Sequence, residues 1–180
     1  FERHATSKIR SAEELFHLST MGFRGEALAS IAAVAQFDIK TRAIGSDIGT
    51  HLVVEASTVK EQEICATPVG TTMAIKNLFF NLPARRKFLK SDPVELRHII
   101  DEFERVALVN EHVEFKLYHN DQELFFLPIG TKRQRIINVL GKSYNEKLVP
   151  VDESTDIVNI SGFVGKPESA RKGRGEQFLF

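Results

Sequence analysis

The chain has 180 residues, 42% of them hydrophobic, enough for one well-filled core or for one domain and part of a second. Basic and acidic side chains balance, so the net charge favours neither a nucleic-acid partner nor an acidic substrate, and no apolar run reaches the ~20 residues that cross a bilayer. We expect a soluble protein, and the single Cys65 excludes an internal disulfide and a zinc site built on several cysteines.

The first third of the chain is expected to form two helices and a strand. Residues 11–20 begin with a capping-box pattern, which predicts a short helix. A second helix is expected over residues 25–34, because small and apolar residues give it an almost wholly buried surface. Apolar and polar residues alternate over residues 37–41, as in a strand.

The middle of the chain predicts strands over residues 51–59 and 72–78. Pro83 opens a short basic helix, and Pro93 opens a longer helix with apolar residues at helical spacing. Two apolar runs flank the polar turn at residues 119–122, which predicts a hairpin.

After residue 128 the pattern restarts, and we place a domain boundary at residues 128–132. A helix ended by Gly141 is expected next, then strands near Leu148 and over residues 157–164. Residues 165–175, rich in Gly, Lys and Arg, are expected to be mobile. The chain begins at Phe1 without an initiator Met and ends inside an apolar run, so we expect both ends to lie within a longer protein.

Two glycines bracket an aromatic residue and an arginine in Gly22-Phe23-Arg24-Gly25, directly before the second expected helix. Glycine lets the main chain approach a ligand closely, and backbone N–H groups at a helix start can bind an anion. The loop is a candidate phosphate cradle. Because glycine near a helix start is commonplace, a purely structural turn is the alternative.

The segment before the first helix carries two hydroxyls and a cation, in Thr6, Ser7 and Lys8. These groups could hydrogen-bond nucleotide phosphates from a flexible cover, and a solvated loop is the alternative. Glu26 beside Arg24 has the composition of a catalytic pair, although an ion pair at a helix end is the commoner explanation. The six histidines are scattered along the chain without metal-ligand spacing.

Basic residues gather in three places. The first group is Arg85, Arg86, Lys87 and Lys90, with Phe88 and Leu89 expected to anchor the other face of the helix. The second is Lys132, Arg133 and Arg135, and the third is Arg171, Lys172 and Arg174. If these groups line one groove, they would bind a nucleic-acid backbone irrespective of its sequence. The alternative is a solvated helix face, partly neutralised by acidic neighbours.

Three segments, in this order, closely resemble the signature segments of MutL-type DNA mismatch-repair proteins. They are RHATSKI from Arg3, GFRGEALASI from Gly22, and GTT from Gly70 followed by LFFNLPARRKFLK from Leu78. The resemblance is strong from residue 1 to about residue 110 and weaker beyond it.

The resemblance implies a member of the GHKL superfamily of ATPases, in which the nucleotide lies on an antiparallel sheet beneath a mobile lid. It implies that Thr6, Ser7 and Lys8 belong to the lid. It also implies that Gly22, Phe23, Arg24 and Gly25 form the phosphate loop, and that Thr71 or Thr72 lies near the adenine. ATP with Mg²⁺ is the implied cofactor.

In this family a glutamate activates the attacking water and an asparagine holds magnesium, and both precede the first residue here. The resemblance therefore implies no catalytic residue and no metal ligand within the chain. Glu26 cannot replace the base, because in the family this residue starts the helix after the phosphate loop. We expect the chain alone to be inactive as an ATPase.

The expected fold is α/β. Residues 1–128 are expected to form a mainly antiparallel sheet backed by helices, an incomplete GHKL (Bergerat-type) ATPase domain, and residues 129–180 to begin a second α/β domain with a ribosomal-protein-like βαβ fold. By resemblance, the full protein would form a homodimer or heterodimer, bind DNA without sequence preference, and link a mismatch-recognition protein to nicking and unwinding enzymes. No membrane is implied, and the location would be the cytoplasm or nucleoid of a bacterium, which is favoured, or a eukaryotic nucleus.

Two alternatives remain from the sequence. One is a non-catalytic module that docks on nucleic acid or protein through the basic helix. The other is a chaperone or topoisomerase of the same superfamily, against which the segment LPARRKFLK argues.

Overall fold

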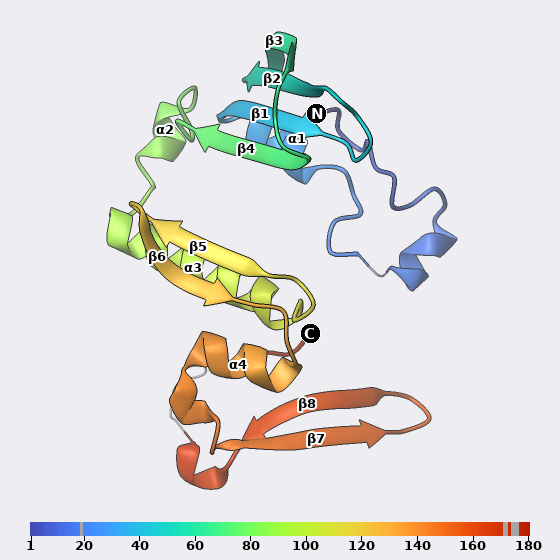
Figure 1. Ribbon diagram of the computed structural model, residues 1–180, viewed down its shortest axis with the longest axis vertical. Helices are drawn as coiled ribbons and strands as arrows, with labels where there is room; N and C mark the ends of the chain where they lie inside the picture. The colour runs from blue at the N-terminus through green and yellow to red at the C-terminus, as the bar shows by residue number, and fades with distance from the viewer. Residues whose placement is uncertain (19, 171–172, 174–176) are drawn as a thin grey trace. The chain divides into compact units, whose positions relative to one another are not determined.

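The computed structural model describes residues 1–18, 20–170, 173 and 177–180. The chain divides into two compact units, residues 1–89 and residues 90–180. Both units combine helices with antiparallel strands (Figure 1), which confirms the predicted α/β class with mainly antiparallel sheets. The domain boundary expected at residues 128–132 stays a prediction. Among the described residues, no helix is long and apolar enough to cross a membrane.

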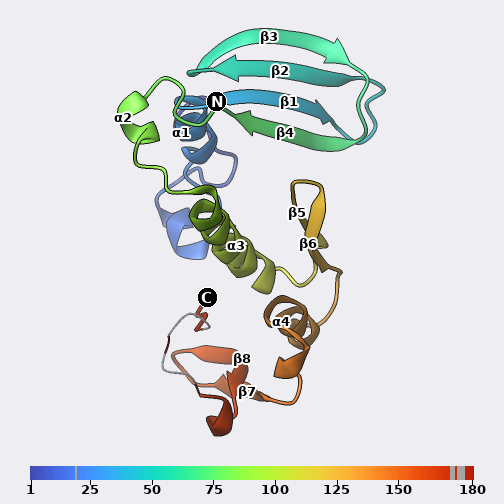
Figure 2. The ribbon, with the colours of Figure 1, turned by 90° about the vertical axis from the view of Figure 1, so that its left-hand side faces the viewer.

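The first unit is built on a four-stranded antiparallel sheet in the order β3-β2-β1-β4 (Figure 2). Its strands are β1 (Gln36–Arg42), β2 (Gly49–Glu55), β3 (Thr58–Cys65) and β4 (Gly70–Lys76). The single strand expected over residues 51–59 is wrong, because the chain reverses at Ala56 and Ser57, whose φ angles are positive. Hairpin turns with positive φ favour Gly, Asn and Asp, and neither Ala56 nor Ser57 is one of these, so this hairpin escaped prediction.

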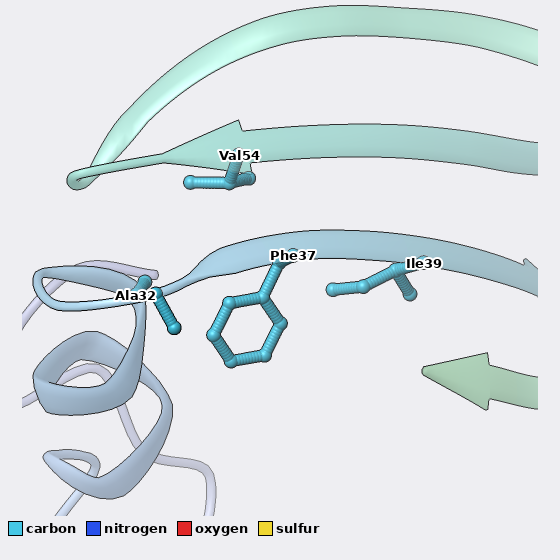
Figure 3. Packing of buried hydrophobic residues seen from close by; sticks show 5 residues of the cluster. Ala32, Phe37, Ile39 and Val54 are labelled. Atoms are coloured by element: carbon cyan, nitrogen blue, oxygen red, sulfur yellow. The ribbon is translucent and has the colours of Figure 1, made fainter. Parts of the chain in front are cut away.

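Helix α1 (Ala27–Ala32) contributes to the core on one face of this sheet. Ala32 lies in one buried cluster with Phe37 and Ile39 of β1 and Val54 of β2 (Figure 3). Phe37 and Ile39 share this face because side chains alternate along a strand. Burying a side chain as large as Phe37 contributes about 1.5–3 kcal/mol, so the cluster fixes the register of β1 and β2.

The N-terminal segment forms less regular structure than the sequence suggested. Instead of an α-helix over residues 11–20, it contains one 3₁₀ helix, η1 (Glu13–His17). The Glu14 carboxylate accepts a hydrogen bond from the backbone N–H of Arg10 at 2.7 Å. This bond is made one residue before position 11, where the expected capping box begins. None of the residues of η1 is buried, so no core packing supports a longer helix here.

The basic helix α2 (Pro83–Arg86) is short, and Lys87 is its C-cap. The expectation that Phe88 and Leu89 anchor a buried side is wrong, because Phe88 is 79% exposed and Leu89 is also exposed. Lys90 lies beyond the end of α2, so it does not share a helix face with Arg86.

The second unit contains the helices α3 and α4 and two β-hairpins. Helix α3 (Asp92–Leu108) packs on the hairpin of β5 (Phe115–His119) and β6 (Gln122–Leu127), with the Phe103 ring 5.9 Å from Phe115 and 5.4 Å from Phe125. Helix α4 (Lys132–Leu140) joins the same core through Val139. A second hairpin follows, of β7 (Leu148–Ser154) and β8 (Asn159–Gly165), flanked by η2 (Lys142–Tyr144) and η3 (Pro167–Ser169).

Each end of α4 has a local cause, and the C-terminal one was predicted from the sequence. The Thr131 hydroxyl accepts a hydrogen bond from the backbone N–H of Gln134 at 3.2 Å, which caps the first turn. Gly141 ends the helix with a φ of 107°. This conformation favours glycine, so the predicted stop is confirmed.

Candidate functional site

Two segments that the sequence singled out separately lie in contact in the first unit. We call residues 3–8 the cover segment and residues 22–25 the glycine loop. The backbone N–H of His4 donates to the carbonyl of Gly25 at 3.1 Å, and the His4 Nδ1 atom lies 3.3 Å from a Glu26 carboxylate oxygen. These contacts close the cover segment onto the glycine loop just before α1.

The close approach requires glycine at position 25. Its φ is +69°, and a Cβ atom added there would lie 2.4 Å from the backbone oxygen of Ala5. Gly22 differs, because a Cβ atom there would meet nothing within 4 Å. The first glycine of the loop is therefore replaceable on steric grounds, whereas the second is not.

A hollow of 350 Å³ is lined by the cover segment, by residues 9–15 and, from the glycine loop, by Arg24 alone. Its lining residues are His4, Thr6, Ile9, Arg10, Ser11, Ala12, Leu15 and Arg24. The lining residues carry two guanidinium groups, two hydroxyls and an imidazole beside the apolar Ile9, Ala12 and Leu15, and no carboxylate residue is among them. This donor set suits an anion such as a phosphate, and it lacks the carboxylate that a magnesium site usually contains.

The hollow contains only part of the predicted ATP site. Thr6 and Arg24 line it, whereas Ser7, Lys8, Gly22, Phe23 and Gly25 belong to the same two segments without being among its lining residues. The Thr6 hydroxyl accepts a hydrogen bond from the backbone N–H of Lys8 at 3.1 Å, which tightens the cover segment. Arg10 and Ser11 line the hollow although the sequence reading missed them. Their only signal was their position directly after the cover segment.

The predicted adenine-side residues lie on β4. The Thr71 hydroxyl oxygen lies 2.8 Å from that of Thr41, its directly paired residue on β1, and Thr72 pairs with Lys40. Neither threonine lines the hollow described above. Both are exposed, so their hydroxyls are open to a ligand over this end of the sheet.

The first basic group is open to solvent. Arg85, Arg86 and Lys87 are all exposed on α2 and its C-cap, and none of the ion pairs between described residues involves them. Lys90 is exposed too, but it belongs to the second unit. The group is a compact cation cluster at the end of the first unit.

The second basic group is mostly engaged in the fold. Arg133 donates to the carbonyl of Leu148 at 3.4 Å and to the side chain of Asn145 at 3.3 Å, and its guanidinium lies 5.8 Å from the Phe163 ring centre. Lys132 is exposed, with its ammonium 3.4 Å from the Ser161 hydroxyl. The third group, Arg171, Lys172 and Arg174, lies outside the described residues.

Arg135 is placed differently from a nucleic-acid ligand. Its side chain is 1% exposed and donates to backbone carbonyls of α3, the following loop and the end of β6, namely those of Ala107, Asn110, Glu111, Val113 and Pro128. The guanidinium also lies 5.3 Å from the Phe115 ring centre. Burial lowers the pKa of Arg135 from its ordinary value. In this conformation it cannot reach a phosphate, so we leave it out of the DNA surface proposed below.

A larger cavity, of 770 Å³, lies within the second unit. Side chains of α4, β8 and the C-terminal residues line it, including Ile136, Leu140, Phe163 and Phe178. It contains Lys132 and none of the predicted ATP-site residues. Because aromatic and aliphatic side chains form much of its wall, it does not suit a triphosphate.

Sequence comparison matches the whole chain to bacterial mismatch-repair proteins. The chain is 59% identical over its 180 residues to the DNA mismatch repair protein MutL of Flavobacterium psychrophilum and 62% identical to that of Christiangramia forsetii. It spans 29% of the length of each of these relatives. No family profile matches the chain.

Comparison with solved structures gives the same neighbours. The Aquifex aeolicus MutL ATPase domain complexed with ADP is 30% identical with a TM-score of 0.65, and the match covers 80% of this chain and 56% of that one. The ATPase domain from the bacterial mismatch repair endonuclease Aquifex aeolicus MutL is 25% identical with a TM-score of 0.64, over 92% of this chain and 58% of that one. The N-terminal domain of a DNA repair protein, 18% identical with a TM-score of 0.75, supports the fold alone.

Proposed function

Since the chain belongs to the MutL family of DNA mismatch repair proteins, we propose that its first unit supplies part of an ATP site. The cover segment and the glycine loop would together hold the nucleotide phosphates. The observation that carries this proposal is the hollow that Thr6 of the cover segment and Arg24 of the glycine loop both line, together with Arg10. A solved relative of the same family is described as complexed with ADP, which supports the choice of ligand.

We assign the roles from the position of each group. Arg24 and Arg10 would neutralise phosphate charge, and Thr6 and Ser11 would donate hydroxyl hydrogen bonds. Ser7 and Lys8 would close over the same phosphates when the cover segment moves, and the Gly22–Gly25 backbone would approach them. Thr71 or Thr72 would contact the base side of the nucleotide. The Mg²⁺ that accompanies ATP would find no carboxylate among the lining residues of this hollow, so we assign it no ligand in this chain.

We expect the 180-residue chain alone to release no phosphate from ATP above the buffer background. Of the carboxylates beside the lining residues, that of Glu26 lies 3.3 Å from His4, and that of Glu14 accepts from the backbone N–H of Arg10 at 2.7 Å. Neither is positioned as a free general base. A steady-state phosphate assay on the wild type and on the Glu26→Gln variant should therefore give the same background rate. Turnover that disappears in an Arg24→Ala variant would contradict this expectation.

DNA binding is the second proposed activity, and the exposed cluster of Arg85, Arg86 and Lys87 supports it. These side chains extend from a short helix that no described ion pair neutralises. Within the second unit, Lys90 and Lys132 are exposed and could each contact a phosphate, whereas Arg133 could add little while it is bound to the fold. Such a surface would read the phosphate backbone and not the bases.

The double variant Arg85→Glu, Arg86→Glu should bind any duplex more weakly, by the same factor for two unrelated sequences. Each phosphate contact contributes roughly 0.9 to the slope of log affinity against log salt, so that slope should flatten by about two. Fluorescence anisotropy across a salt series measures both effects. The control is Lys60→Glu, which changes an exposed lysine on β3. Equal affinities for the double variant and the wild type would assign the cluster to a solvated surface.

The finer cellular role follows from the family and is proposed for the whole protein. We propose that it dimerises and links a mismatch-recognition protein to enzymes that nick and unwind DNA, with nucleotide binding as the switch. The relatives compared above are bacterial, so we place this activity at bacterial DNA.

A further inference from the structure

A polar cluster lies on the face of the first unit's sheet opposite the Phe37 core, and the functions proposed above do not use it. His51 on β2 pairs directly with Glu63 on β3, and Glu61, two residues before Glu63, lies on the same face. The His51 Nδ1 atom lies 3.2 Å from a Glu63 carboxylate oxygen, and its Nε2 atom lies 3.0 Å from a carboxylate oxygen of Asp38 on β1. One imidazole is therefore held between carboxylates from both neighbouring strands.

This arrangement requires a cation. A neutral imidazole has one N–H group, so it can donate to only one of the two carboxylates, and the lone pair of its other nitrogen would then face a carboxylate oxygen. Either a second proton or a metal ion between Nδ1 and Glu63 removes this repulsion.

The spacing of the groups fits a metal ion. The ligand atoms of His51, Glu61 and Glu63 all lie within 4.8 Å of one another. Zinc bonds of about 2.0–2.2 Å place tetrahedral ligands roughly 3.3–3.6 Å apart. The 3.2 Å between His51 Nδ1 and Glu63 is already close to that value. Glu61 is exposed on the edge strand, so its side chain is free of core packing and can close the remaining distance.

Asp38 has the position of a supporting residue for such a site. With the imidazole proton on Nε2, Asp38 accepts from it, and the Nδ1 lone pair then points toward Glu63. Asp38 is itself held by the ammonium of Lys76 on β4, at 3.3 Å. A carboxylate that orients a ligating histidine in this way is a recurring feature of metal sites.

We propose that His51 Nδ1, Glu61 and Glu63 bind a divalent transition-metal ion, with Asp38 as the positioning residue and water completing the coordination. Zinc is the best match, because it accepts one imidazole and two carboxylates in a four-coordinate site. Magnesium is not, because it requires octahedral oxygen ligands. Lys40, directly opposite His51 on β1, and Lys76 add positive charge to this face, so we expect moderate affinity. The bound ion would tie the edge strand β3 to β2.

The test is isothermal titration of the full 180-residue chain, free of nucleotide, with zinc chloride and separately with magnesium chloride. We expect one saturable zinc site and no comparable magnesium site. His51→Gln and Glu63→Gln should abolish the zinc site, and Asp38→Asn should weaken it by about tenfold. The matched control is His98→Gln, because His98 lies 3.9 Å from Glu95 on α3 in an exposed pair without a second carboxylate.

Glu61→Gln keeps the proposal testable if a His51 variant fails to fold, because it leaves the hydrogen bonds of His51 to Asp38 and Glu63 in place. It should fold as the wild type does, by circular dichroism, and bind zinc at least tenfold more weakly. Zinc binding that survives in His51→Gln, or zinc binding lost equally in His98→Gln, would overturn the site. Absence of saturable zinc binding in the wild type would also overturn it and would leave a proton as the only cation between these groups.

Discussion

Replacing Arg135 by methionine is expected to lower the free energy of unfolding of the second unit by about 3–5 kcal/mol. Methionine nearly fills the volume of the arginine stem, so the loss comes mainly from the hydrogen bonds. Five backbone carbonyls, of Ala107, Asn110, Glu111, Val113 and Pro128, accept from this one guanidinium. Without it, the buried carbonyl of Ala107 and four partly buried carbonyls of the neighbouring segments would lose their donor.

Urea unfolding followed by circular dichroism measures this effect. Arg135→Lys should be intermediate, because an ammonium keeps the charge but cannot present the planar fork of donors. Lys132→Met, on the same helix but exposed, is the control and should change the free energy by less than about 0.5 kcal/mol. If Arg135→Met were as stable as the wild type but bound DNA weakly, Arg135 would instead be a DNA ligand.

Replacing Gly25 by alanine is expected to reduce nucleotide affinity by about tenfold or more, which corresponds to about 1.4 kcal/mol. The new Cβ atom would lie 2.4 Å from the Ala5 oxygen, and the φ of +69° is itself unfavourable for alanine. The cover segment must then move away from the glycine loop. That movement would take Thr6 away from Arg24 and so open the hollow that both residues line.

Gly22→Ala is the matched control, because the same change in the same loop meets no atom within 4 Å. It should retain most of the affinity for a fluorescent ATP analogue, measured by anisotropy. Equal losses in the two variants would mean that the loop needs general flexibility and not the close approach at Gly25. If Gly25→Ala kept the affinity of the wild type, nucleotide binding would not depend on the close contact between Gly25 and Ala5.

Local patterns predicted much of the fold because they act over a few residues. Alternation in β1, the proline that opens α3 and the glycine that ends α4 all appear where the sequence indicated. The turn at Ala56 and Ser57 did not, because neither residue is among those usual at positive φ and because the backbone N–H of Ser57 donates to the distant carbonyl of Ala32. The helix α2 is shorter than expected because Phe88 and Leu89 are exposed and provide no packing that would extend it.

The surroundings of the site residues depend on contacts between segments far apart in the chain, so the sequence did not predict them. Arg135 reads as one more cation in a basic run, and only the packing of α4 on α3 and β6 places it beneath five carbonyls. His51 has no ligand spacing along the chain, and the pairing of β2 with β3 brings Glu63 to it. The cover segment and the glycine loop were recognised separately, whereas their contact through His4 and Gly25 is a finding of the structure.

The most direct test of the proposed ATP site is amide NMR of the ¹⁵N-labelled chain titrated with ATP. We predict saturable chemical-shift changes concentrated in residues 3–11 and 22–26, with further changes at Thr71 or Thr72, and their loss in the Arg24→Ala variant. Adenosine without phosphates should leave the glycine loop unchanged, because that loop is proposed to bind the phosphates. Saturable shifts confined to the apolar cavity of the second unit, or no shifts in the cover segment and glycine loop, would contradict the account.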